Sequence, residues 1–143
     1  MPTFPRVSAT LLAFAATGLL SPAWAEQMMF HADLSGAAQV PPVDTAATGT
    51  ADVTVDSEAM TVSWTIAYDG LSGDPVAAHF HGPASPEETA PPVIDITADL
   101  MEGSADITAE QMQMIQDGMT YINIHTEANP DGEIRGQVMA AAE

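Results

Sequence analysis

The chain has 143 residues, of which 46% are hydrophobic, enough for one domain with a packed core and too few for two. Twenty acidic residues stand against two basic ones, a balance that excludes binding to nucleic acids or to anionic membrane surfaces. Because cysteine is absent, disulfides, thiolate catalysis and cysteine-ligated metals are excluded, and any metal must be bound by His, carboxylate or Met.

The first 25 residues have the pattern of a secretory signal peptide. Arg6 precedes an apolar stretch that is shorter than a membrane span, and Ala23-Trp24-Ala25 is a small-x-small cleavage pattern. We expect residues 1–25 to be removed, which leaves a periplasmic or secreted domain over residues 26–143 with no membrane attachment. That domain keeps all twenty acids and a single base, Arg135, so its formal charge is −19.

Alternating apolar and polar residues predict seven strands in the mature chain, separated by turn-forming Gly, Pro, Asp and Asn. The expected strands are Met28–Leu34, Thr48–Val55, Met60–Tyr68, Val76–His81, Val93–Leu100, Thr120–Thr126 and Glu133–Ala140. Thr108 and Gln111 fit a capping box, which predicts one short helix ending near Gly118. The pattern predicts an all-β fold, an antiparallel Greek-key β-sandwich or flattened barrel with one short helix.

The four histidines all fall within predicted strands. Ala78 and Phe80 alternate with His79 and His81, so the two imidazoles project together from the face opposite the core. The same alternation places His125 and His31 on the outward faces of their own strands. Two histidines at i and i+2 on a strand, joined by a third from another strand, form an open imidazole site for copper or zinc.

We therefore take His79, His81 and His125 as candidate metal ligands, with His31 as the fourth. Copper is the expected cofactor, because imidazoles without thiolates favour Cu(II) in the affinity order of divalent metals. The alternative is that these histidines are solvated or structural hydrogen-bonding residues and bind no metal. Glu133 and Arg135 share one face of the last strand, which predicts an ion pair between them.

Three motifs occur in order at Leu34–Val43, Ala78–Ala84 and Tyr121–Gln137, and together they resemble the chordin-type (CHRD) domain family. The resemblance covers nearly all of the mature chain. It implies an all-β exported domain, found in bacterial proteins and as repeats in chordin, with no generally established enzymatic activity. It also implies the main alternative to a copper-binding protein: a non-metallated structural module that binds an extracytoplasmic protein.

A weaker likeness is to copper-zinc superoxide dismutase, through the strand His-x-His, a later strand histidine and a C-terminal arginine element. That likeness implies His79, His81 and His125 as copper ligands and Arg135 as an anion-guiding residue. The chain departs from that family because it lacks the disulfide cysteines and has too few histidines for a bridged copper and zinc pair. A domain of such negative charge also repels superoxide, so a dismutase is the least favoured of the three functions.

Overall fold

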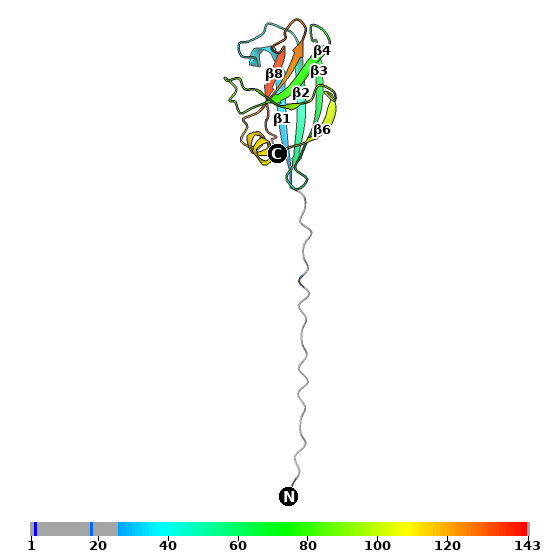
Figure 1. Ribbon diagram of the computed structural model, residues 1–143, viewed down its shortest axis with the longest axis vertical. Coiled ribbons are helices and arrows are strands. Elements are labelled where there is room, and N and C mark those ends of the chain that lie inside the picture. Colours follow the sequence, from blue (N-terminus) through cyan, green and yellow to red (C-terminus); the bar gives the residue numbers. More distant parts are fainter. Residues whose placement is uncertain (1, 3–17, 19–25, 143) are drawn as a thin grey trace.

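The computed structural model describes residues 2, 18 and 26–142, and residues 26–142 form an antiparallel β-structure (Figure 1). The predicted signal peptide and its cleavage pattern lie outside the described residues, apart from Pro2 and Gly18. In the described part of the chain, no helix is long and apolar enough to span a bilayer.

The described chain contains nine strands, one α-helix and one short 3-10 turn. The strands pair throughout as antiparallel neighbours in the order β5-β4-β7-β8-β1-β2-β3-β6, and β9 pairs with β1. Their bounds are β1 Gln27–Ser35, β2 Thr48–Asp56, β3 Thr61–Asp69, β4 Pro75–His81, β5 Pro92–Asp95, β6 Glu102–Asp106, β7 Tyr121–Thr126, β8 Ile134–Gln137 and β9 Met139–Ala140. The helix α1 spans Ala109–Gln116, and the 3-10 turn η1 spans Gly36–Ala38.

The sheet folds over its own hydrophobic face into a nearly closed barrel (Figure 1). Alternating residues of β2 and β3, such as Val53 and Val62, point into the core, as do Phe80 of β4 and Ile122 of β7. Trp64 of β3 meets Phe80 edge to face, with ring centroids 6.0 Å apart, so strands from opposite sides of the barrel are in contact. The predicted all-β fold class is confirmed.

The predicted helix and its capping box are also confirmed. The Thr108 side chain accepts from the Gln111 backbone N–H, and the Gln111 side chain accepts from the Thr108 backbone N–H. Three strand predictions need correction. The single strand predicted over Glu133–Ala140 is divided into β8, Ile134–Gln137, and β9, Met139–Ala140. The strand predicted over Val93–Leu100 ends at Asp95, whose carboxylate accepts from the Thr97 backbone N–H and turns the chain. The strand β6, at one edge of the sheet, was not predicted.

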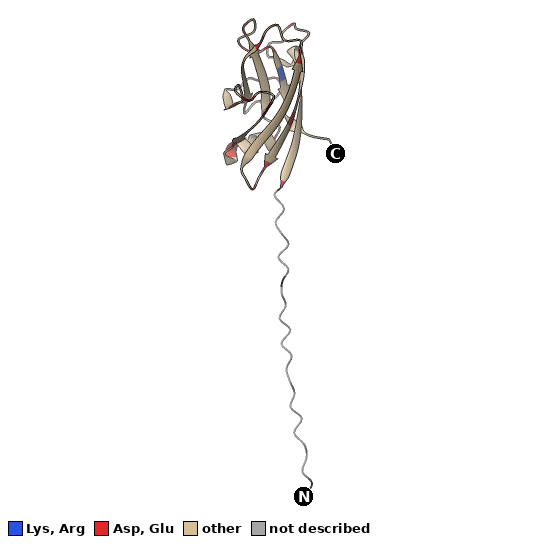
Figure 2. Cartoon of the chain, turned by 90° about the vertical axis from the view of Figure 1, so that its right-hand side faces the viewer, with Lys and Arg blue, Asp and Glu red and all other residues tan. Residues whose placement is uncertain are grey.

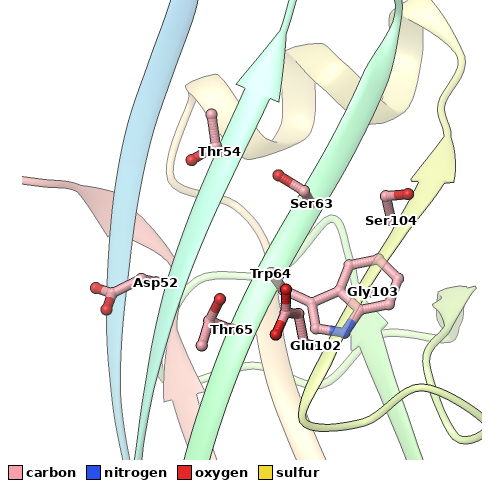
Figure 3. A pocket seen from close by; sticks show the side chains of 8 residues that line it. All are labelled: Asp52, Thr54, Ser63, Trp64, Thr65, Glu102, Gly103 and Ser104. Atoms are coloured by element: carbon pink, nitrogen blue, oxygen red, sulfur yellow. The ribbon is translucent and has the colours of Figure 1, made fainter.

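The outer face of β2, β3 and β6 is polar, as the alternation requires. Figure 3 shows hydroxyl and carboxylate side chains along these strands, around a shallow groove of about 600 Å³. Residues lining it include Asp52, Thr54, Thr65 and Glu102. The histidine cluster lies elsewhere, on the outer face of β4 and β7.

Candidate metal centre

Three histidines converge where β4 and β7 pair. His79 and His81 lie on β4, His125 lies on β7, and the two strands are hydrogen-bonded neighbours. The alternation that sends Phe80 and Ile124 into the core sends all three imidazoles to the opposite face. One ring nitrogen of each histidine lies within 4.8 Å of those of the other two. Within the described residues, this is the one group of three or more such side chains close enough to hold a metal ion.

Hydrogen bonds outside the cluster determine which nitrogen of each ring faces inward. The Nδ1 of His81 lies 2.9 Å from the Ala90 carbonyl, and the Nδ1 of His125 lies 2.8 Å from the Pro130 carbonyl. A carbonyl oxygen only accepts, so each Nδ1 carries the proton and donates it. In the neutral imidazoles of His81 and His125, this tautomer leaves the lone pair of Nε2 available to a metal.

The third histidine presents the other ring nitrogen. The Nδ1 of His79 lies 3.4 Å from the Nε2 of His125, and the Nε2 of His79 lies 4.0 Å from a carboxylate oxygen of Asp95 on β5. In one tautomer Nδ1 of His79 carries the proton and donates it to Nε2 of His125; in the other the proton is on the outer Nε2, towards Asp95, and Nδ1 is free as a ligand. The three inward atoms are thus Nδ1 of His79 and Nε2 of both His81 and His125.

The site is buried on two sides. His81 and His125 are 8% and 9% exposed, because the loops that carry Ala90 and Pro130 cover them, whereas His79 is only partly buried. Burial, aided by the positive charge that His125 would carry, holds the pKa of His79 below 6.5 despite the nearby Asp95. Burial is also the main cause that lowers the pKa of His81. Both imidazoles are therefore neutral at pH 7, the form that binds metals.

One buried atom of the cluster lacks a partner. The Nε2 of His81 is fully shielded from solvent and makes no hydrogen bond within the described residues. A buried polar atom without a partner costs about 1–3 kcal/mol, so such atoms are rare without a functional reason. A metal bound to this nitrogen would remove the penalty.

An aromatic stack supports His81 from the side of β7. The His81 and Tyr121 rings are parallel to within 2°, with centroids 4.8 Å apart. The Arg135 guanidinium lies 3.5 Å from the centroid of the Tyr121 ring. The Ala90 backbone holds both rings by hydrogen bonds: its N–H donates to the Tyr121 hydroxyl, and its carbonyl accepts from both Tyr121 and His81. The ring plane of His81 is therefore fixed before any metal binds.

The structure does not bring His31 to the other three histidines. His31 lies on β1, and β7 and β8 separate β1 from β4 in the sheet. Its Nδ1 lies 2.8 Å from Asp52 and its Nε2 lies 3.2 Å from Asp33. The hydrogen bond to Asp52, followed by that to Asp33, raises the pKa of His31, so this imidazole behaves as a surface ion-pairing group.

The predicted ion pair between Glu133 and Arg135 is wrong. Both side chains are buried, but Arg135 donates from Nη2 to the carbonyls of Ser85 and Pro86 at 3.1 and 3.4 Å. Arg135 is the one lysine or arginine among the described residues, seen as the blue segment among the strands in Figure 2, and it is 1% exposed. A guanidinium that is 1% exposed and stacked on Tyr121 offers little of its charge to an anion in solution.

Glu133 instead ties three segments together. Its carboxylate accepts from the hydroxyls of Thr45 and Thr126 at 2.9 Å and from the Ser72 backbone N–H and hydroxyl at 3.0 Å. Burial raises the pKa of Glu133, but these hydrogen bonds outweigh that effect and hold the pKa below its ordinary value. Sequence reasoning missed this cluster because its donors lie in loops remote from Glu133.

Comparison with known proteins gives two matches. The model of the CHRD domain family matches residues 30–138. Chordin of Danio rerio is 32% identical over 117 residues, which cover 73% of this chain and 12% of chordin, so the chain corresponds to a small part of that protein. No solved structure matches, and the likeness to copper-zinc superoxide dismutase remains a prediction.

Proposed function

The chain belongs to the CHRD domain family, and on that premise we propose that it is an exported domain that binds one copper ion through His79, His81 and His125. Export to the periplasm or the exterior is supported by the signal-peptide pattern of residues 1–25. The observation that carries the metal assignment is the convergence of three imidazole nitrogens within 4.8 Å of one another, one of which is buried with no other partner.

Copper fits this donor set better than the other common metals. Three neutral imidazoles without a carboxylate or a thiolate are a poor site for Mg²⁺ or Ca²⁺, which require oxygen ligands. Among divalent transition metals, nitrogen sites bind Cu²⁺ most tightly and Zn²⁺ less so. The hydrogen bonds to Ala90 and Pro130 preset two of the rings, which lowers the entropic cost of binding.

The proposal is tested by titrating the mature, untagged protein with Cu(II) and with Zn(II). We expect one tight equivalent of copper, with an affinity above that for zinc. His81→Ala should abolish tight binding, whereas His31→Ala, a matched loss of one imidazole outside the cluster, should leave the affinity within about threefold. Equal copper affinities in the two variants would show that the metal does not bind at the cluster of His79, His81 and His125.

A second candidate is a module that binds an extracytoplasmic protein and holds no metal. It is favoured by the same hydrogen bonds, because His81 and His125 each fasten a loop carbonyl and so have a structural role without copper. In that case His81→Ala should destabilise the apo domain by about 1 kcal/mol or more, and copper should not raise the Tm of the wild type.

Superoxide dismutation gains no support from this geometry. The resemblance assigned Arg135 the role of guiding the anion, but its guanidinium is 1% exposed and lies against Tyr121.

A further inference from the structure

We propose that the buried charge of Arg135, placed behind Tyr121, shifts the relative affinity of the copper site towards Cu(I) and away from Cu(II). The inference rests on the proposed function, since it concerns the oxidation state of the ion that His79, His81 and His125 bind.

His81, Tyr121 and Arg135 form a stack, and His81 is also a member of the histidine cluster. His81 is on β4, Tyr121 on β7 and Arg135 on β8, and β7 is the strand between the other two. The imidazole and the phenol ring are stacked at 4.8 Å, and the guanidinium lies 3.5 Å from the phenol centroid. Tyr121 thus separates the cation from a metal ligand by a single ring, and it excludes water from the space between them, being 2% exposed.

The charge of Arg135 is not neutralised. An arginine side chain stays protonated in proteins, and Arg135 forms no ion pair with a carboxylate of the described residues. Its hydrogen-bond acceptors are two backbone carbonyls, those of Ser85 and Pro86. The carboxylate of Glu133, its neighbour in sequence, is occupied by hydroxyl and backbone donors instead.

The carboxylate beside the outer nitrogen of His79 has a weaker effect than Arg135 because it is exposed. Asp95 lies 4.0 Å from the outer nitrogen of His79 and would favour the more highly charged ion, but its side chain is 72% exposed and water screens it. Arg135 is almost fully buried, so its field reaches the cluster through protein. Burial thus gives Arg135 a larger effect on the cluster than Asp95 has.

The effect on copper follows from charge alone. Cu(II) and Cu(I) differ by one unit of charge, and the three neutral imidazoles compensate neither ion. A buried unit charge at about 10 Å, with an effective dielectric constant of about 20, changes the ratio of the two affinities by roughly tenfold. The partial burial of the cluster shifts the ratio of the two affinities in the same direction, because desolvation disfavours the more highly charged ion.

The test measures both dissociation constants on the full mature domain, with a Cu(I)-selective chelator under ascorbate and a Cu(II) chelator in air. Arg135→Gln should increase the ratio of the Cu(I) to the Cu(II) dissociation constant about tenfold. Arg135→Lys, which keeps the charge, should stay within about threefold of the wild type. Gln27→Glu applies the same charge change at an exposed position and should leave the ratio within about twofold.

A purely structural role predicts a different result, because loosening of the site weakens the binding of both ions and leaves their ratio unchanged. If Arg135→Gln does not fold, Tyr121→Leu replaces it, since water entering behind His81 screens the cation and moves the ratio in the same direction. One bound copper with an unchanged ratio in the charge-removing variant overturns this inference alone. Absence of copper binding in the wild type overturns the proposed function and the inference together.

Discussion

Glu133→Gln is expected to be among the most destabilising conservative substitutions in the domain. The carboxylate is 0% exposed and accepts from two hydroxyls at 2.9 Å and from both donors of Ser72 at 3.0 Å. Hydrogen bonds to a charged group contribute about 1.5–3 kcal/mol each, against about 1 kcal/mol for neutral pairs. The amide keeps the shape but loses the charge and one acceptor oxygen, so we expect a loss of about 3 kcal/mol in the free energy of unfolding.

Urea denaturation at pH 7 measures this loss, with Thr126→Val as the matched control. Thr126→Val removes one of the donors without a change of shape and should cost about 1.5 kcal/mol. Because the two groups share a hydrogen bond, the double variant should lose less than the sum of the single losses. A loss below about 1 kcal/mol for Glu133→Gln would show that the carboxylate is not the centre of this cluster.

Further predictions concern pH and the helix. Glu133 has a lowered pKa, so the stability it contributes above pH 4.5 is lost as the pH falls through its folded value, and Glu133→Gln should show a shallower loss of Tm in acid. The pKa values of His79 and His81 are also lowered, but a histidine gains its charge on protonation. In acid the unfolded chain therefore binds more protons than the folded chain, and the stability of the apo domain falls as the pH drops below about 6.5. The variant His79→Ala, His81→Ala should lack that part of the fall in Tm between pH 7 and pH 5, and identical profiles would contradict the burial argument. Thr108→Ala removes the capping hydroxyl of α1 and should lower the free energy of unfolding by about 1 kcal/mol, and an unchanged urea midpoint would contradict the role of the capping box.

The strands that alternation predicts best are those with one buried face. In β2 and β3, Val53, Val62 and Trp64 point inward and polar residues point outward, so the two-residue alternation in the sequence matches the structure. The edge strand β6 has the sequence Glu-Gly-Ser-Ala-Asp, without a large apolar residue, and it forms because its backbone pairs with β3. Strand pairing of this kind is tertiary information that a local pattern does not contain.

The histidine cluster was predictable only in part, because a local pattern does not show which strands are neighbours. Alternation gives the face on which His79, His81 and His125 lie, and the structure brings these three together. It does not give strand order, which sets His31 apart from them on β1. Nor does it show that loops cover the outward face, which is why His81, Arg135 and Glu133 are buried although their strand phase indicates an outward side.

The most direct test of the copper assignment is a crystal structure of the copper-loaded mature domain, with anomalous scattering recorded at the copper edge. We expect one peak, at about 2.0–2.1 Å from Nδ1 of His79 and from Nε2 of His81 and His125, the usual distance from an imidazole nitrogen to an ion of this size. A peak beside His31, or no peak within reach of all three nitrogens, would contradict the assignment.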